Sequence, residues 1–190
     1  MGRELGRKAF HMASAALPAF AWFAPRPLAM TVLAVLAVVA VAVDHARLRY
    51  RVPRYYFLRA TRTLLRRHER HGFAGATYMA VAYAAAFALF PRPVAVAGML
   101  YNGLGDAAAA LVGKRFGRHR TAWGKSWEGF AAGLAVSLAV GLAIPGIPVA
   151  GALLGALAAA TLEFLPLPVD DNLRVTLGGA LGCWVGAVMF

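Results

Sequence analysis

Residues 27–43 read PLAMTVLAVLAVVAVAV, an unbroken apolar stretch that contains no charged side chain. A helix of this length covers most of a bilayer's hydrocarbon core, which is about 30 Å thick and takes about 20 residues. Charged residues stand immediately beyond its two ends, at Arg26 and Asp44. This stretch therefore predicts a membrane-spanning helix, and several other stretches of the chain are similar to it.

The composition of the whole chain is that of a membrane protein. Of its 190 residues, 61% are hydrophobic and only 15% are charged, whereas soluble domains are nearer half apolar and a quarter charged. In so apolar a chain, the net charge of +12 predicts contact with anionic lipid, and we expect no nucleic-acid partner. The single cysteine, Cys183, excludes a disulfide framework. We expect one membrane-embedded domain over residues 1–190.

Seven apolar segments are candidate transmembrane helices. They cover residues 9–24, 27–43, 73–90, 93–113, 128–145, 147–163 and 174–190. Proline cannot continue a helix from the preceding turn, so the proline-rich breaks at 25–27, 91–93 and 145–148 predict tight hairpins. The predicted fold class is therefore all-α, a polytopic integral membrane protein with about seven transmembrane helices.

Charge is distributed unequally between the two ends of these segments. With the N-terminus placed in the cytoplasm, eighteen of the twenty lysines and arginines fall on the cytoplasmic side, and only Arg26 and Arg92 fall outside. Cytoplasmic loops of membrane proteins carry such an excess of basic residues. All eight acidic residues and all five histidines fall on the same side. We therefore expect an integral protein of the cell inner membrane, with its N-terminus and a candidate active site facing the cytoplasm and its C-terminus outside.

Asp106 is the most informative acidic residue, because it lies inside the apolar segment 93–113. A carboxylate within a membrane costs about 2.5–3.5 kcal/mol on insertion scales, so intramembrane acids are usually functional. Asn102 precedes it by four residues and would share its helix face. A carboxylate and an amide oxygen can hold Mg²⁺ together with phosphate oxygens. We therefore predict that Asp106 is catalytic and binds a metal, with Asn102 as a second metal ligand.

The segment 113–128 follows directly and is short, basic and rich in glycine. Fixed cations and free backbone N–H groups suit a polyphosphate. The candidate phosphate-binding residues are Lys114, Arg115, Lys125 and Ser126. Gly124-Lys125-Ser126 is similar to the end of a P-loop, but the loop's first glycine would have to stand at His119. The P-loop fold is therefore rejected, and the phosphate-binding chemistry is retained.

Polar residues also precede the first apolar segment. Glu4, Arg7, Lys8 and His11 are spaced so that they form one stripe on a helix entering the membrane. A snorkelling anchor accounts well for Arg7 and Lys8. It accounts less well for Glu4 and His11, so a functional role for the stripe stays open.

Asp170-Asp171-Asn172 adjoin the start of the last apolar segment. Two acids and an amide at a membrane surface can bind a metal or position a hydroxyl group. We predict Asp171 as a catalytic residue, and Asp170 and Asn172 as metal ligands. The alternative is that Asp171 or Asn172 only caps the last helix.

The basic segment 44–72 holds nine arginines. One helical face would carry four of them: Arg59, Arg62, Arg66 and Arg70. This pattern predicts an interfacial amphipathic helix on anionic membrane lipid, so most of the net charge would serve topology and lipid attraction. Glycines spaced four residues apart in the last three apolar segments predict close helix packing.

Together these motifs resemble those of the polyprenol kinase family, which includes dolichol kinase, phytol kinase and the CTP-dependent diacylglycerol kinase. Four motifs occur in the family's order from end to end of the chain: Arg7-Lys8-x-x-His11, Gly105-Asp106-Ala107-x-Ala109-x-x-x-Gly113-Lys114-Arg115-Phe116-Gly117, Gly124-Lys125-Ser126-x-Glu128-Gly129 and Asp170-Asp171-Asn172-Leu173. Size and span count look most like the phytol kinase branch. Phytol kinases often have a proline shortly after the last motif, where this chain has Thr176, and this departure leaves the acceptor open.

The resemblance implies transfer of a phosphoryl group from a nucleoside triphosphate to the hydroxyl of a lipid alcohol. Asp106 and Lys125 match motif positions and would have catalytic or nucleotide-binding roles. The other matched positions with implied roles are Lys8, His11, Lys114, Glu128, Asp171 and Asn172. We expect Mg²⁺ as cofactor and CTP as phosphoryl donor, with ATP or another nucleoside triphosphate as alternatives. The acceptor would be phytol, another polyprenol or diacylglycerol, and we also consider a homodimer.

Two alternatives to a lipid kinase remain at this point. The first is a phospholipid cytidylyltransferase, which would release pyrophosphate and form a CDP-lipid. The second is a non-enzymatic transporter or anion-binding membrane protein. A transporter predicts an internal repeat or paired half-helices, and a polar path to the outer face, which is nearly bare of charge here.

Overall fold

The computed structural model describes residues 14–61, 65 and 68–189. Every regular element in this part of the chain is a helix: α2 (Ala16–Phe23), α3 (Arg26–Arg49), α4 (Arg51–Ala60), η1 (His68–Arg70), α5 (Gly75–Leu89), α6 (Arg92–Leu100), η2 (Tyr101–Gly105), α7 (Asp106–Phe116), α8 (Trp127–Ala143), α9 (Val149–Phe164) and α10 (Asp171–Met189). These residues include no strand, only an isolated β-bridge between Arg120 and Ser126. The predicted all-α fold class is confirmed.

Apolar character is strongest in two long helical stretches. By length and composition, α3 and the continuous stretch Arg92–Phe116 are able to cross a membrane. Three more helices, α5, α8 and α9, are apolar but shorter. The predicted segments coincide with helices wherever the structure describes them. The count of seven spans and the sides on which the termini lie stay predictions.

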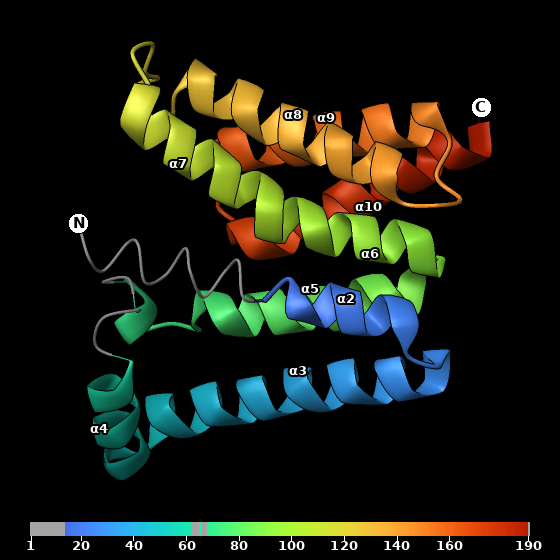
Figure 1. The fold of residues 1–190 in the computed structure, drawn as a ribbon. Coiled ribbons are helices and arrows are strands. Elements are labelled where there is room, and N and C mark those ends of the chain that lie inside the picture. The colour runs from blue at the N-terminus through green and yellow to red at the C-terminus, as the bar shows by residue number, and fades with distance from the viewer. Residues whose placement is uncertain (1–13, 62–64, 66–67, 190) are drawn as a thin grey trace.

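The helices lie side by side, and the chain reverses direction at each turn (Figure 1). As a result, the connections gather at two ends of the bundle. One end carries α4 and the α7–α8 turn, and the other carries the C-terminus and the α5–α6 turn. Helix α10 packs against α9, α6 and α5, and thereby joins the early and late parts of the chain. The large buried side chains of this core include Tyr83, Phe87 and Tyr101.

Small residues allow the last helices to approach closely. A Cβ atom added at Gly182 of α10 would lie 2.7 Å from the carbonyl oxygen of Leu154 on α9. One added at Gly129 of α8 would lie 2.6 Å from the carbonyl oxygen of Ala109 on α7. Any side chain at these positions would push backbone against backbone, so the predicted packing role of the spaced glycines is confirmed.

The arginines predicted on the outer side connect two hairpins to each other. Arg92, in the α5–α6 hairpin, donates to the carbonyl oxygen of Trp22 at 2.9 Å. Arg26, in the α2–α3 hairpin, donates back to the carbonyl oxygen of Phe90 at 3.5 Å. The two hydrogen bonds satisfy carbonyl groups at helix ends, which have no partner within their own helix. Both arginines therefore have a structural explanation.

Helices α6 and α7 are joined by a π-helical segment, η2, instead of continuing as one regular α-helix. In a π-helix the hydrogen bonds connect residues five apart, so residues four apart do not stack as they do in an α-helix. Asn102 lies in this segment, and Asp106 is the first residue of α7 directly after it. Asn102 and Asp106 therefore do not stack one above the other as in the predicted α-helix. π-helical turns are often found at functional sites.

Arg47 differs from the other arginines of the segment 44–72, because its side chain is only 1% exposed. It pairs with Asp44 and donates to the carbonyl oxygens of Glu69 at 3.0 Å and Gly72 at 2.8 Å. The second oxygen of Asp44 accepts from the hydroxyl of Thr77 at 2.6 Å. This buried network fastens α3 to the start of α5. The sequence assigns the arginines of this segment largely to topology and lipid attraction, and the buried Arg47 is an exception.

Candidate active site

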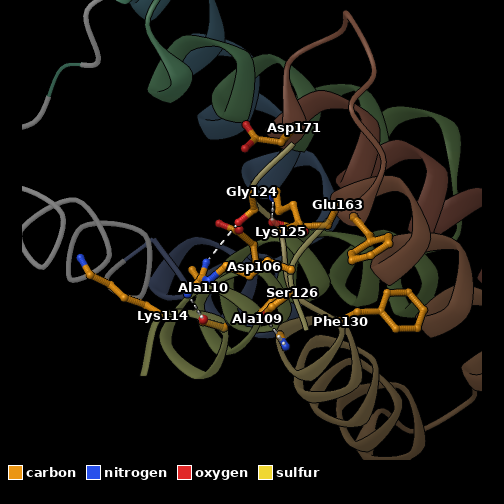
Figure 2. Close-up of a pocket in the computed structure, with 14 residues that line it drawn as sticks. Asp106, Ala109, Ala110, Lys114, Gly124, Lys125, Ser126, Phe130, Glu163 and Asp171 are labelled. Carbon is orange, nitrogen blue, oxygen red and sulfur yellow. Dashed lines mark hydrogen bonds and ion pairs between the residues drawn. The ribbon is translucent and has the colours of Figure 1, made fainter. Parts of the chain in front are cut away.

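A cavity of about 370 Å³ lies between α7, the α7–α8 turn and the adjoining ends of α8, α9 and α10 (Figure 2). Its lining comes from four separate parts of the sequence: Asp106, Ala109, Ala110, Gly113, Lys114, Arg120, Gly124, Lys125, Ser126, Gly129, Phe130, Glu163, Phe164 and Asp171. Three of these residues are acidic and three are basic. The cavity therefore combines opposite charges with an aromatic wall.

Helix α7 places Asp106 and Lys114 on the cavity. They lie eight residues apart, close to two turns of an α-helix, and so share its face. The helix can lie close to α8 because Gly105 faces the Ser137 hydroxyl, which a Cβ atom would meet at 2.4 Å. Asp106 is half-buried and Lys114 is exposed. The acid thus lies deeper in the cavity, and the cation lies at its rim.

The α7–α8 turn is held closed by backbone hydrogen bonds. The N–H of Thr121 donates to the carbonyl oxygen of Lys125 at 2.8 Å. Gly124 has a φ of +86°, a backbone conformation that residues other than glycine rarely adopt. Arg120 donates to the carbonyl oxygens of Gly113 at 2.9 Å and of Gly124 at 3.3 Å, which joins the turn to α7. This turn presents Lys125 to the cavity without the strand that a P-loop requires.

Ser126 lines the cavity but also begins α8. Its hydroxyl accepts a hydrogen bond from the N–H of Gly129 at 3.1 Å, so it is the N-cap of that helix. It is only 4% exposed and packs against the glycines of α7, where a Cβ atom on Gly113 would meet its oxygen at 2.8 Å. Helix capping and close packing therefore explain why a serine stands at this position. Its predicted role in binding a cofactor stays a prediction.

The ammonium group of Lys125 pairs with the carboxylate of Glu163, at the end of α9. Glu163 is buried, and it is near enough to Asp106 for the two carboxyl groups to interact. One cation and two acids thus meet inside the cavity, with Asp171 on the wall contributed by α10 (Figure 2). The structure brings together the three predicted catalytic residues Asp106, Lys125 and Asp171.

The predicted site residues did not include Glu163. The signal was present, because Glu163 is an acid at the end of an apolar segment, and intramembrane acids are usually functional. What the sequence could not show is its partner, which lies 38 residues earlier in the chain. Arg120 was missed for a similar reason, since its position depends on the folding of the turn.

The amides predicted as metal ligands lie outside the cavity lining. Asn102 is buried and donates from its amide nitrogen to the side-chain oxygen of Asn172 at 3.3 Å. Asn172 in turn donates from its own amide nitrogen to Asp170 at 2.9 Å, and its backbone N–H donates to the same oxygen at 3.0 Å. The bond from the backbone to Asp170 is a local turn at the start of α10. These three side chains form a network beside the cavity.

Four predicted nucleotide-binding residues remain to be placed: Arg115, Glu128, Lys8 and His11. Glu128 contacts the ring of His119 at 2.7 Å and accepts from its backbone N–H at 3.1 Å. Arg115 is exposed and stacks over the ring of Phe116 at 5.5 Å. Both lie near the rim but not in the lining. Lys8 and His11 lie outside the described residues, as does the rest of the stripe that begins at Glu4.

The donor set of the cavity fits a magnesium ion only in company with phosphate. Among the described residues, no three His, Cys, Asp or Glu side chains form a metal cluster by themselves. Mg²⁺ does not need such a cluster, because it usually takes one or two carboxylates, several waters and the oxygens of a bound phosphate. Asp106, Glu163 and Asp171 supply carboxylates around one cavity, and this arrangement is compatible with that mode of binding.

A comparison with proteins of known function identifies a relative that matches almost the whole chain. The phytol kinase of Synechocystis sp. is 31% identical over 199 residues, covering 98% of this chain and 81% of the relative. This chain belongs to the polyprenol kinase family. The predicted family membership is thereby confirmed. No family model matches the chain. No solved structure matches it either.

The match to the phytol kinase includes the residues that line the cavity. The match extends over all the elements that line the cavity, from α7 to the start of α10, because it covers nearly the entire chain. The family's central motif coincides with α7 and the α7–α8 turn, and its last motif begins α10. The described motifs of the family, which run from Gly105 to Gly129 and from Asp170 to Leu173, therefore lie around one cavity or immediately beside it.

Proposed function

We propose that this chain is a membrane kinase that transfers a phosphoryl group from a nucleoside triphosphate to the hydroxyl of a lipid alcohol. The observation that carries the proposal is the meeting of Asp106, Lys125 and Asp171 in one cavity. CTP is the proposed donor, on the strength of the family resemblance. The proposed acceptor is phytol, another polyprenol or diacylglycerol, and the relative named as a phytol kinase favours the first.

The cavity has a basic side and an aromatic side, and each suits one of the two proposed substrates. Lys114, Arg120 and Lys125 supply positive charge for the oxygens of a triphosphate. Phe130 and Phe164 form an aromatic wall suited to the apolar part of an alcohol. In Figure 2, Lys114 and the ring of Phe130 lie on opposite sides of Asp106. In this view, Asp106 is drawn between the exposed cation and the aromatic ring.

The transfer forms a bond between the alcohol oxygen and the γ-phosphorus and breaks the bond from that phosphorus to the β–γ bridging oxygen. The nucleoside diphosphate leaves, and the proton of the hydroxyl passes to a carboxylate, for which Asp106 and Asp171 are the candidates. Lys114, Lys125 and Arg120 neutralise the phosphate oxygens and align the reactants, which is most of what phosphoryl transfer requires. Mg²⁺, when bound near Asp106, would offset the charge of the β- and γ-phosphates.

The proposed active site faces the cytoplasm of the cell inner membrane. Its support is that the cavity belongs to the end of the bundle that also carries α4 and the α7–α8 turn (Figure 1). That end holds the basic segments that the positive-inside rule assigns to the cytoplasm. A lipid alcohol held between the helices would present its hydroxyl there, where a nucleotide arrives from water.

The test is a transfer assay on the purified chain in lipid nanodiscs. With γ-labelled CTP or ATP, Mg²⁺ and a panel of phytol, geranylgeraniol, undecaprenol and diacylglycerol, we expect label in a lipid phosphate, and none after chelation of Mg²⁺. CTP labelled at the α-phosphate, offered with phosphatidic acid, provides the matched control, because a cytidylyltransferase would place that label in a CDP-lipid and release pyrophosphate. If no combination of nucleotide and alcohol yields a lipid phosphate, the proposal is wrong.

The predicted helical face from Arg59 to Arg70 is not found as one α-helix, because α4 ends at Ala60 and Arg70 lies in η1, while Arg62 and Arg66 lie outside the described residues. We also propose that α4 lies on anionic lipid at the membrane surface. No residue of α4 is buried, and the helix combines the exposed Tyr55 and Tyr56 with the basic residues Arg51, Arg54 and Arg59. It lies across the end of α3 rather than along the bundle (Figure 1). Aromatic rings and arginines on such a helix suit the headgroup region.

This contact can be measured with a dye on α4. Cys183 is buried, so a cysteine introduced as Val52→Cys takes up the label selectively. We expect the dye to report a less polar environment in nanodiscs of phosphatidylglycerol than of phosphatidylcholine, and the difference to shrink at high salt. Replacing Arg51, Arg54 and Arg59 by glutamine should remove about 1 kcal/mol of attraction per arginine. Equal spectra in the two lipids would contradict the proposal.

A further inference from the structure

The α7–α8 turn is attached to the end of α9 at two neighbouring residues. Besides the ion pair of Lys125 with Glu163, the indole N–H of Trp123 donates to the carbonyl oxygen of Phe164 at 2.9 Å. The ring of Trp123 also lies 6.0 Å from that of Phe164 in an edge-to-face arrangement. The carbonyl of Phe164 belongs to the last turn of α9, where carbonyl groups have no partner within the helix. The turn and the helix end therefore satisfy each other.

The two contacts act on different parts of the turn. The bond from Trp123 goes to the main chain of α9 and fixes the place of the turn. The bond from Lys125 goes to a side chain inside the cavity and fixes the direction of the ammonium group (Figure 2). A lysine side chain has a flexible stem of four carbons and takes many conformations unless a partner selects one. Glu163 is such a partner, and it is attached to a helix rather than to a loop.

We propose that Glu163 is a positioning residue of this site: it holds the ammonium group of Lys125 in the cavity, ready to meet the triphosphate. This inference rests on the proposed kinase function and names a residue that the family motifs quoted above do not include. On nucleotide binding, Lys125 exchanges part of its contact with Glu163 for phosphate oxygens. Glu163 itself does not need to touch the nucleotide.

A double-mutant cycle on Lys125 and Glu163 tests whether one residue acts through the other. Glu163→Gln keeps the size of the side chain and removes its charge, and Lys125→Met removes the ammonium group. For the nucleotide, we expect Glu163→Gln to lower kcat/KM by about tenfold or more in the wild-type chain and by less than about threefold in the Lys125→Met chain. The KM for the lipid alcohol should stay unchanged in Glu163→Gln, whereas a merely structural defect would also alter it.

A second measurement does not depend on catalysis. The chain contains only three lysines, Lys8, Lys114 and Lys125, so lysine labelled with ¹³C at Cε gives a spectrum of three signals. We expect Glu163→Gln to shift the Lys125 signal and leave the Lys114 signal in place. Addition of a non-hydrolysable triphosphate analogue with Mg²⁺ should shift the Lys125 signal in the wild-type chain.

The outcomes separate this inference from the proposed function. If the wild-type chain transfers no phosphate but Glu163→Gln moves the Lys125 signal and weakens analogue binding, the positioning role stands and the kinase proposal fails. If the kinase is active but the effects of the two substitutions multiply independently, Glu163 acts directly on the substrates and the positioning role is wrong. An unchanged Lys125 signal in Glu163→Gln would also overturn it.

Discussion

Replacing Asp106 with asparagine is expected to lower kcat for phosphoryl transfer by about 10²–10³-fold, the usual cost of removing one group that stabilises developing charge. The substitution keeps the shape of the side chain and removes the negative charge at the centre of the cavity. That charge is needed whether Asp106 binds the magnesium ion or accepts the proton of the alcohol. The measurement is kcat at saturating nucleotide and lipid, with wild-type chain prepared in the same nanodiscs.

The stability of this variant should not fall, and this separates a catalytic role from a structural one. Asp106 is a half-buried acid in an apolar helix, and Glu163 lies near enough to interact with it. Removing one negative charge lowers the cost of placing the helix in the membrane and reduces the repulsion between the two acids. We therefore expect an unchanged or higher unfolding temperature. Full activity in Asp106→Asn would show that the site assignment is wrong.

The same assay examines the role of Asn102. If its amide helps to hold the magnesium ion, as the sequence predicts, Asn102→Ala should raise the Mg²⁺ concentration needed for half-maximal activity. If the amide serves only its bond to Asn172, the variant should lose stability and keep its Mg²⁺ dependence. The two results are distinct, because one concerns the titration with metal and the other concerns unfolding.

The helices could be predicted from the sequence because their signals are local. Apolar runs and prolines identified the segments, and the helices from α5 onward begin and end within about three residues of the predicted limits. By contrast, α3 continues to Arg49, beyond the predicted end at residue 43, and α2 begins only at Ala16. Asp106 and Lys125 could be found because a charge in an apolar run and a basic turn rich in glycine are visible within a few residues. The π-helical segment at Tyr101–Gly105 has no such signal. Gly105 in this segment lies against α8, where an added Cβ atom would meet the Ser137 hydroxyl at 2.4 Å, and such a contact is not visible in a single sequence.

Long-range pairs were not predictable in the same way. Lys125 and Glu163 meet only because α8 and α9 form a hairpin that returns the chain to the same end of the bundle. The network of Asn102, Asn172 and Asp170 likewise joins residues up to 70 positions apart. A single sequence shows that each residue is polar, but it does not show which of them meet. Partner choice follows from packing, and packing is decided by all the helices together.

Arg47 is the clearest example, and replacing it with methionine is expected to destabilise the protein by about 3–5 kcal/mol, the usual cost of breaking a buried ion pair. The substitution would leave the carboxylate of Asp44 buried without its cation, and the carbonyl oxygens of Glu69 and Gly72 without their donor. It would also remove the stacking of the guanidinium 4.5 Å over the ring of Phe57. For a chain of this size, the unfolding temperature should fall by about 10 °C.

Arg49→Met is the matched control, because Arg49 lies on the same turn of α3 and is exposed. We expect it to change the unfolding temperature by less than about 2 °C, since exposed arginines contribute little to stability. The double variant Asp44→Asn with Arg47→Met should be more stable than Arg47→Met alone, because it no longer buries an unpaired charge. Equal unfolding temperatures for Arg47→Met and Arg49→Met would mean that Arg47 is one more lipid-facing arginine of the segment 44–72. The expected difference instead assigns Arg47 to the fold and leaves lipid attraction to the exposed arginines around it.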